Sequence, residues 1–217
     1  MKAEWLRKLR RLLDLDIVKR NEVIIKVVAV SFLTLLYFSI ILTVATFAVF
    51  PWLLEWLKSL MPTDGFPSPF TTEFFCYILS NNLSHFWNPP KMLVWIPFLG
   101  TVLLGLELSL NAIVIGVAVV TAGMKRGALF PMVGIVPHGI LEIPAFILQF
   151  VCFALLHITI IQFLLAKIVG EKTNSAKLKQ GVKDAVIFGV VAVLFFTIAA
   201  LIETYVTPFL LGLFYSC

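Results

Sequence analysis

The sequence predicts an all-α membrane protein, a polytopic bundle of about five transmembrane helices preceded by an amphipathic helix at the membrane surface. Three observations predict this fold class. Of the 217 residues, 60% are hydrophobic and only 13% are charged, whereas soluble domains carry about 25% charged residues. Mean hydropathy is +1.02. Several apolar runs also reach the roughly 20 residues that a helix needs to cross a bilayer. We therefore expect residues 1–217 to form a single domain embedded in lipid.

Residues 1–22 are predicted to form a cytoplasmic amphipathic helix. Its apolar residues recur at intervals of three and four, namely Trp5, Leu9, Leu12, Leu13 and Ile17. Lysines and arginines lie between them, so we expect the basic face to bind anionic lipid headgroups. The alternative is a solvated helix that docks on the bundle's own loops.

The first three predicted spans cover residues 23–50, 70–88 and 92–122. The first and third are strongly apolar, and a turn-rich connection, Met61 to Pro69 (MPTDGFPSP), follows the first. Residues 70–88 are ambiguous by hydropathy, because polar residues interrupt the apolar ones. The decision about this segment depends on the charge distribution.

The fourth predicted span, residues 129–166, is longer than one perpendicular crossing requires. Prolines and glycines interrupt its first third: Pro131, Gly134, Pro137, Gly139 and Pro144. We expect a broken or re-entrant start of the helix near residues 131–144, facing the bundle interior, since irregular backbone at membrane depth must be sheltered by protein. Residues 185–214 form the last predicted span.

Pairs of small residues four apart predict close approach of the helices in two places. Ala112 and Gly116 form the first pair, and Ala185 and Gly189 form the second. In so apolar a composition, either pair taken alone is almost as readily explained by chance.

Basic residues predict the orientation of the bundle. Eight lysines or arginines lie between Lys2 and Lys26, and five more lie between Lys167 and Lys183. The positive-inside rule places both groups in the cytoplasm, so an odd number of crossings must separate them. Counting residues 70–88 as a span gives five helices in a plasma membrane, with a cytoplasmic N-terminus and an extracytoplasmic C-terminus. The alternative places residues 70–88 at the surface and hides a second crossing within residues 129–166.

Several classes of function lack a signal in the sequence. Nothing outside the membrane is long enough to present a basic face to nucleic acid, although net charge is +5. Cys76, Cys152 and Cys217 are odd in number and far apart, so neither a disulfide framework nor a thiolate metal site is indicated. No Walker loop, nucleophile elbow or Rossmann glycine pattern occurs. We therefore expect no enzymatic activity, no catalytic residue, no metal site and no cofactor.

Three glutamates, Glu107, Glu142 and Glu203, lie within apolar segments that contain no lysine or arginine. A lone carboxylate in hydrocarbon costs several kcal/mol, so each must be protonated, hydrogen-bonded, hydrated or bound to a cation. A spacing of four residues places Asn111 beside Glu107 and His138 beside Glu142. We expect a buried polar cluster near the middle of the membrane.

His138 and Glu142 admit three interpretations. A structural polar knot is favoured, and ion or proton handling is the second choice. Metal-dependent catalysis is the third, because the HExxH pattern of zinc proteases, with its third ligand, is absent.

Two motifs carry a resemblance to a known family, namely Pro137–Glu142 (PHGILE) and Ala199–Pro208 (AALIETYVTP). Asn81 and Asn82, followed by a glycine-bearing helix that contains Asn111, add a third point of agreement. The chain resembles the stage II sporulation protein M family of multispanning membrane proteins. This resemblance implies five spans and, in spore-forming bacteria, a non-catalytic scaffold for two cell-wall-degrading partners, sporulation proteins D and P.

The predicted cluster, structural or functional, combines these residues with the buried glutamates: Asn81, Asn82, Glu107, Asn111, His138, Gly139, Glu142 and Glu203. The leading interpretation of function is a non-enzymatic scaffold that recruits partner proteins at the membrane. Its partners would be cell-wall-degrading enzymes where the host has peptidoglycan, and a homodimer is compatible with the same reading. The alternatives are an ion or small-solute transporter or channel that uses the buried glutamates and histidine, and an intramembrane metalloenzyme.

Overall fold

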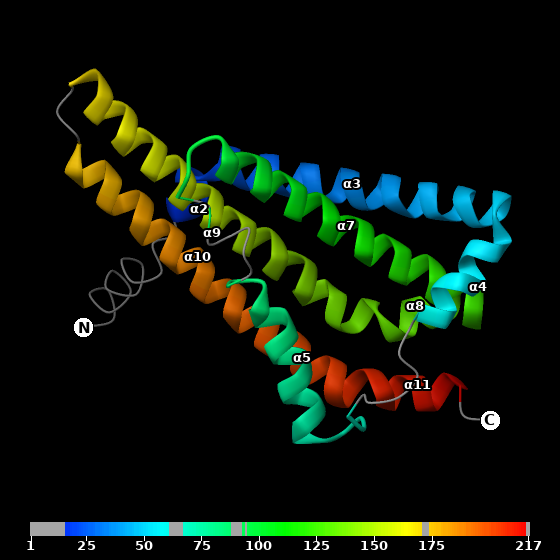
Figure 1. Cartoon of the computed structure of the whole chain (residues 1–217). Coiled ribbons are helices and arrows are strands. Elements are labelled where there is room, and N and C mark those ends of the chain that lie inside the picture. The colour runs from blue at the N-terminus through cyan, green and yellow to red at the C-terminus, as the bar shows by residue number, and fades with distance from the viewer. Residues whose placement is uncertain (1–15, 61–66, 88–92, 94, 171–173, 216–217) are drawn as a thin grey trace, which may run out of the picture.

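The structure, a computed structural model, describes residues 16–60, 67–87, 93, 95–170 and 174–215. Every regular element within these ranges is a helix (Figure 1). Of the predicted amphipathic helix over residues 1–22, most lies outside the described residues, so its basic face stays a prediction. Its described end includes a short helix, α2 (Asp16–Arg20).

Four helices in the described part of the chain are long and apolar enough to cross a membrane. They are α3 (Glu22–Val49), α7 (Leu99–Arg126), α9 (Val136–Val169) and a final helix made of α10 (Ser175–Leu201), the π-helix η1 (Ile202–Val206) and α11 (Thr207–Tyr215). The predicted class, a polytopic all-α membrane bundle, is therefore confirmed.

The count of five spans is not confirmed. The ambiguous segment at residues 70–88 forms α5 (Thr72–Ser84), which has 13 residues. Such a helix is about 20 Å long, shorter than the roughly 30 Å of hydrocarbon in a typical bilayer. The polar residues that interrupt this segment belong to a helix that covers only part of the membrane depth.

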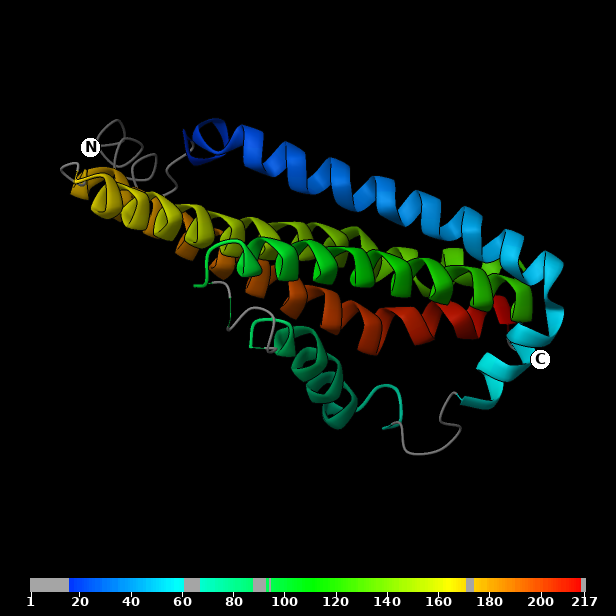
Figure 2. The same ribbon diagram turned by 45° about the horizontal axis from the view of Figure 1, so that its top comes forward.

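The direction of the helices explains why α5 is needed. In Figure 1, α3 and α7 run the same way, α9 runs back, and α10 follows the direction of α3. The chain must therefore return across the bundle between Val49 and Leu99, and α5 forms part of that return. Figure 2 shows α5 on one flank of the bundle and α3 on the opposite flank. The starts of α3 and α10 lie at the same end, so the described basic residues of the first group, Lys19, Arg20 and Lys26, lie at the end of the bundle where α10 begins.

Two contacts show that α5 runs antiparallel to α10. The backbone N–H of Phe70, just before α5, donates to the carbonyl of Thr204 at 3.2 Å. Just after α5, the Phe86 ring contacts Phe196 with a centroid distance of 6.4 Å. The helix therefore packs on the flank of the final helix and stops partway along the bundle.

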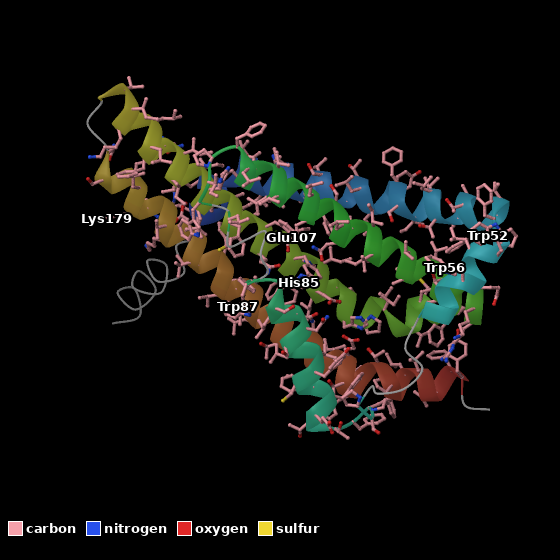
Figure 3. The ribbon with its side chains drawn as sticks, in the orientation of Figure 1. Trp52, Trp56, His85, Trp87, Glu107 and Lys179 are labelled. Atoms are coloured by element: carbon pink, nitrogen blue, oxygen red, sulfur yellow. The ribbon has the colours of Figure 1, made fainter. Side chains whose placement is uncertain are left out.

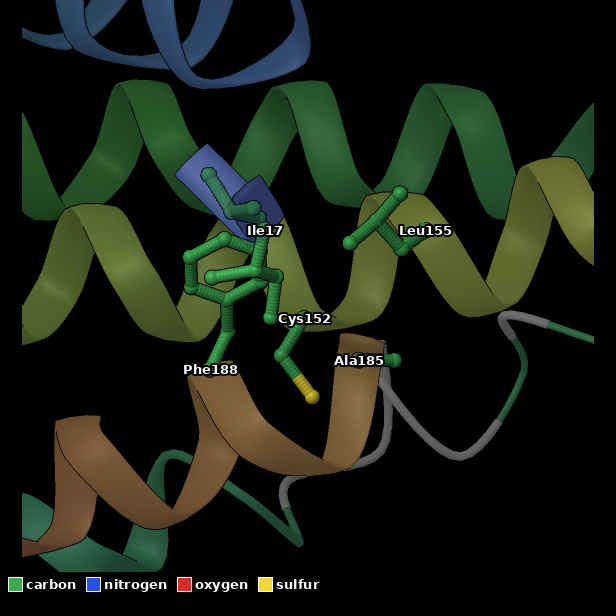
Figure 4. Close-up of a cluster of buried hydrophobic side chains, with 6 residues drawn as sticks. Ile17, Cys152, Leu155, Ala185 and Phe188 are labelled. Carbon is green, nitrogen blue, oxygen red and sulfur yellow. The ribbon is translucent and has the colours of Figure 1, made fainter. Parts of the chain in front are cut away.

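The centre of the bundle is the antiparallel pair α9 and α10. Phe146 and Phe196 stack edge to face with ring centroids 5.0 Å apart, and a Cβ added at Gly189 would lie 3.3 Å from the Cys152 Sγ. A cluster of buried side chains fills the adjoining space (Figure 4): Ile17, Val151, Cys152, Leu155, Ala185 and Phe188. Since Ile17 comes from α2, the start of the chain packs on the same core.

A polar clamp ties the start of α3 to α10. Asp184 is only 2% exposed, and it accepts hydrogen bonds from Arg20 Nε and Nη2, both at 2.8 Å. Asn21 Nδ2 donates to the same carboxylate at 2.8 Å, and Gln180 Nε2 donates at 2.7 Å. Four donors thus compensate one buried carboxylate.

The predicted break near residues 131–144 lies at Ile135, between α8 (Leu129–Gly134) and α9. The helix continues through Pro144 without a second interruption. A re-entrant path is not confirmed.

The predicted small pair on α7 is confirmed at the contact with α3. Ala112 and Gly116 are both buried, and Ser39 Oγ on α3 donates to the Ile113 carbonyl at 3.1 Å. A Cβ added at Gly116 would lie 2.8 Å from Ser39 Cβ and 3.2 Å from the Ile40 backbone nitrogen. The absence of a side chain at Gly116 therefore permits the two parallel helices to approach.

Gly116→Ala is expected to lower the stability of the bundle by about 1–3 kcal/mol, because α3 and α7 must move apart to admit the methyl group. Thermal unfolding of the purified protein in detergent measures this effect. The matched control is Gly105→Ala on the same helix, where nothing lies within 4 Å of an added Cβ. Equal melting temperatures for the two variants would contradict the proposed packing.

Candidate functional site

A cavity of about 610 Å³ lies between α5, α7 and α9. Its polar wall comes from six residues: Asn81, Asn82, His85, Glu107, Asn111 and Glu142. The remaining wall is apolar: Leu103, Leu106, Leu110, Val114, Ile115 and Phe146. The structure therefore brings five of the eight predicted cluster residues to one cavity. Figure 3 places Glu107 and His85 in the middle of the bundle, between the ends marked by Lys179 and Trp52.

Helix α7 presents its polar residues to the cavity by periodicity. Leu103, Glu107, Leu110, Asn111 and Val114 recur at intervals of three and four, so they share one face. The Asn111 Nδ2 donates to the Glu107 backbone carbonyl at 2.9 Å. The expected pairing of these two residues is therefore present, but it uses the backbone of Glu107.

Helix α5 carries two predicted residues in its last turns, Asn81 and Asn82. Asn82 is buried, and its Nδ2 has no hydrogen-bond partner. Asn81 is exposed, so the prediction that it is buried was wrong. Adjacent helical residues point about 100° apart, and Asn82 takes the inward position. Both residues still line the cavity.

The end of α5 borders the cavity and affects the electrostatic potential there. The helix begins at a Thr71 cap, whose Oγ1 accepts from Phe74 N at 3.1 Å, and it ends at His85. The His85 ring stacks edge to face on Phe146, with centroids 5.2 Å apart. The last turn of a helix carries partial negative charge, so the cavity receives negative potential from this end.

A second polar group surrounds His138 on α9. Its Nδ1 lies 3.4 Å from Thr207 Oγ1, and its Nε2 lies 3.8 Å from Glu142 Oε2. The sequence pairing of His138 with Glu142 is therefore present as a long contact. The π-helix that carries Glu203, η1, packs against α9.

Glu203 belongs to the π-helix η1, where the Thr207 N–H donates to the Ile202 carbonyl, five residues back. Pro208 follows, and its missing N–H removes one α-helical bond at this place. Single π-turns of this kind widen a helix and are frequent at functional sites.

Gly139 is buried but takes no part in the polar contacts. A Cβ added there would meet only the side chain of Ile135, at 3.8 Å. The structure therefore gives no steric reason for glycine at this position.

The glutamates do not all converge. Thr101 Oγ1 on α7 contacts His157 Nε2 on α9 at 2.7 Å, which fixes the relative level of the two antiparallel helices. Counted from this contact at 1.5 Å per residue, Glu107 lies about 9 Å away along α7. Glu142 lies about 22 Å away along α9, in the same direction. Glu107 is therefore offset by about 13 Å from Glu142 along the bundle.

Among the described residues, no group of three or more His, Cys, Asp or Glu side chains is placed to hold a metal ion. The interpretation as a metalloenzyme thus gains no complete ligand set from this part of the chain.

Sequence reasoning missed three polar positions in the interior. His85 lines the cavity, His157 contacts Thr101, and Gln149 is fully buried. The signal that selected the glutamates, a polar residue within an apolar run, applies equally to His157 and Gln149. His85 had no such signal, because its segment is interrupted by many polar residues.

Comparison with known proteins completes the description of the site. The model of the family described as stage II sporulation protein M matches residues 40–208. The chain belongs to this family. The match covers well over half of the chain and includes all three helices that line the cavity, so the resemblance noted in the sequence is confirmed. No curated protein and no solved structure matches the chain.

Gln149→Met is expected to raise stability by about 1–2 kcal/mol, because neither side-chain polar atom of this buried residue has a hydrogen-bond partner. Denaturant unfolding in detergent micelles measures the change. Gln180→Met is the matched control and should lower stability, since it removes a donor to Asp184. A destabilised Gln149→Met protein would show that the amide has a partner in the native membrane protein.

Proposed function

We propose that this family member is a non-enzymatic membrane scaffold that recruits partner proteins at the plasma membrane. Family membership and the multi-pass bundle support a role within the membrane. The observation that carries the proposal is an exposed amphipathic helix at one end of the bundle, α4 (Pro51–Leu60).

Two tryptophans, Trp52 and Trp56, make α4 a candidate docking helix. They are one turn apart and are 65% and 51% exposed. Figure 3 shows them at the end of the bundle opposite Lys179. Exposed aromatic residues anchor partners at protein interfaces, and they also sit at membrane surfaces. A partner that approaches along the bilayer surface would meet both rings.

The charge pattern gives the proposed orientation. The basic end, with the start of α3 and the connection between α9 and α10, faces the cytoplasm and its anionic headgroups. Helix α4 and the end of α11 then lie on the extracytoplasmic side (Figure 1). Where the host has peptidoglycan, cell-wall-degrading partners act on that side.

Site-specific photo-crosslinking in the native host tests this role. A photoreactive amino acid in place of Trp52 is expected to give crosslinks to a different protein, and Trp52→Ala with Trp56→Ala should abolish its recruitment. The matched position is Trp87, which is 67% exposed but follows α5. Crosslinks from Trp52 to lipid alone, or equal protein crosslinks from Trp87, would reject α4 as the docking helix.

A second candidate function is an ion or small-solute pathway. It is favoured by the cavity and by the helix α5, which ends partway across the membrane. Helices that end at membrane depth often line transport sites. Purified protein in vesicles is expected under this alternative to conduct protons, cations or small solutes, with a loss of flux in Glu142→Gln. Vesicles that show no flux across a broad panel would eliminate it.

A further inference from the structure

The charges around the cavity favour a positively charged occupant. Glu142 contributes a carboxyl group to the wall, and the end of α5 adds its partial negative charge. Within the described part of the chain, no lysine or arginine side chain lines the cavity. Carboxyl groups in a low-dielectric setting stabilise a nearby cation strongly.

The size and the apolar wall exclude a bare metal ion as the main occupant. The volume of about 610 Å³ falls within the roughly 300–1,000 Å³ of small-molecule sites. Three leucines, Leu103, Leu106 and Leu110, cover much of the wall on α7. The axial offset of Glu107 and Glu142, about 13 Å, prevents both carboxyl groups from binding one small ion. An elongated molecule with an apolar body suits this shape.

Asn82 provides the second, independent indication of a ligand. Its side chain lines the cavity, is only 3% exposed, and has an Nδ2 without a hydrogen-bond partner. A buried unsatisfied donor costs about 1–3 kcal/mol. A bound molecule with an acceptor oxygen would remove this cost.

We propose that the cavity between α5, α7 and α9 binds a linear organic ammonium ion that carries a hydroxyl or carbonyl oxygen. The ammonium group lies against the carboxyl group of Glu142, the methylene chain lies along the leucines of α7, and the oxygen accepts from Asn82.

This site goes beyond the scaffold role and does not require transport. Binding at equilibrium can occur in a protein that shows no flux. A negative result in the crosslinking experiment would count against α4 as the docking helix, but not against ligand binding in the cavity. Each proposal therefore has a separate readout.

The test uses the full chain in lipid nanodiscs and 6-amino-1-hexanol as the probe, with thermal stability as the readout. We expect a saturable rise in melting temperature. Three compounds of similar length serve as controls: 1,6-hexanediol lacks the charge, 6-hydroxyhexanoate reverses it, and hexylammonium lacks the oxygen. The first two should give no saturable shift in melting temperature. Hexylammonium should bind about tenfold more weakly than the probe, because it offers no acceptor oxygen to the Asn82 Nδ2.

Variants assign the effect to the cavity. Glu142→Gln is expected to weaken binding of the probe by about tenfold or more, and Asn82→Ala by about tenfold. Glu73→Gln is the matched control, since Glu73 lies on α5 but is exposed and outside the cavity wall. If a glutamine variant fails to fold, Val114→Phe supplies the test, because this exposed wall position accepts a ring that occupies the cavity.

Three results would overturn the proposal. Equal shifts with 1,6-hexanediol would show apolar binding only. A probe effect that is insensitive to all cavity variants would place binding elsewhere. A saturable shift with sodium chloride alone, lost in Glu142→Gln, would assign the cavity to an alkali cation.

Discussion

Polar side chains inside a bilayer must find partners within the protein, because hydrocarbon offers them no hydrogen bonds. In this bundle several threonines return their hydroxyl hydrogen bonds to their own helix, as Thr43, Thr197 and Thr204 do with the carbonyl four residues earlier. Asp184 instead accepts hydrogen bonds from Arg20 at the end of α2, from Asn21 just before α3 and from Gln180 on α10. These contacts hold the start of α3 against the α9 and α10 pair, on which the remaining helices pack.

The same constraint explains the short helix α5. A segment rich in asparagine and histidine is poorly suited to face lipid along its whole length. Here it forms a helix of only 13 residues that ends partway along the bundle. Its last turn then brings Asn82 and His85 opposite Glu107 and Glu142. The end of this short helix therefore forms part of the cavity wall.

The proposed docking helix and the cavity belong to one stretch of chain. Helix α4 follows α3 directly, and the connection after α4 leads into α5, whose end forms part of the cavity wall. The docking helix and the ligand site are therefore proposed on one return segment of the chain, and the two roles are compatible within one family member.

The sequence by itself determined the membrane class, the four long helices, the break near Ile135 and the polar residues that had to be sheltered. These follow from local hydropathy, proline placement and the cost of burying charge, which act over a few residues. Three other features depend on the register between helices that are far apart in the chain. They are the length of α5, the burial of Asn82 rather than Asn81, and the separation of Glu107 from Glu142. That register is set by contacts such as Ser39 with Gly116 and Thr101 with His157, so only the tertiary structure decided it.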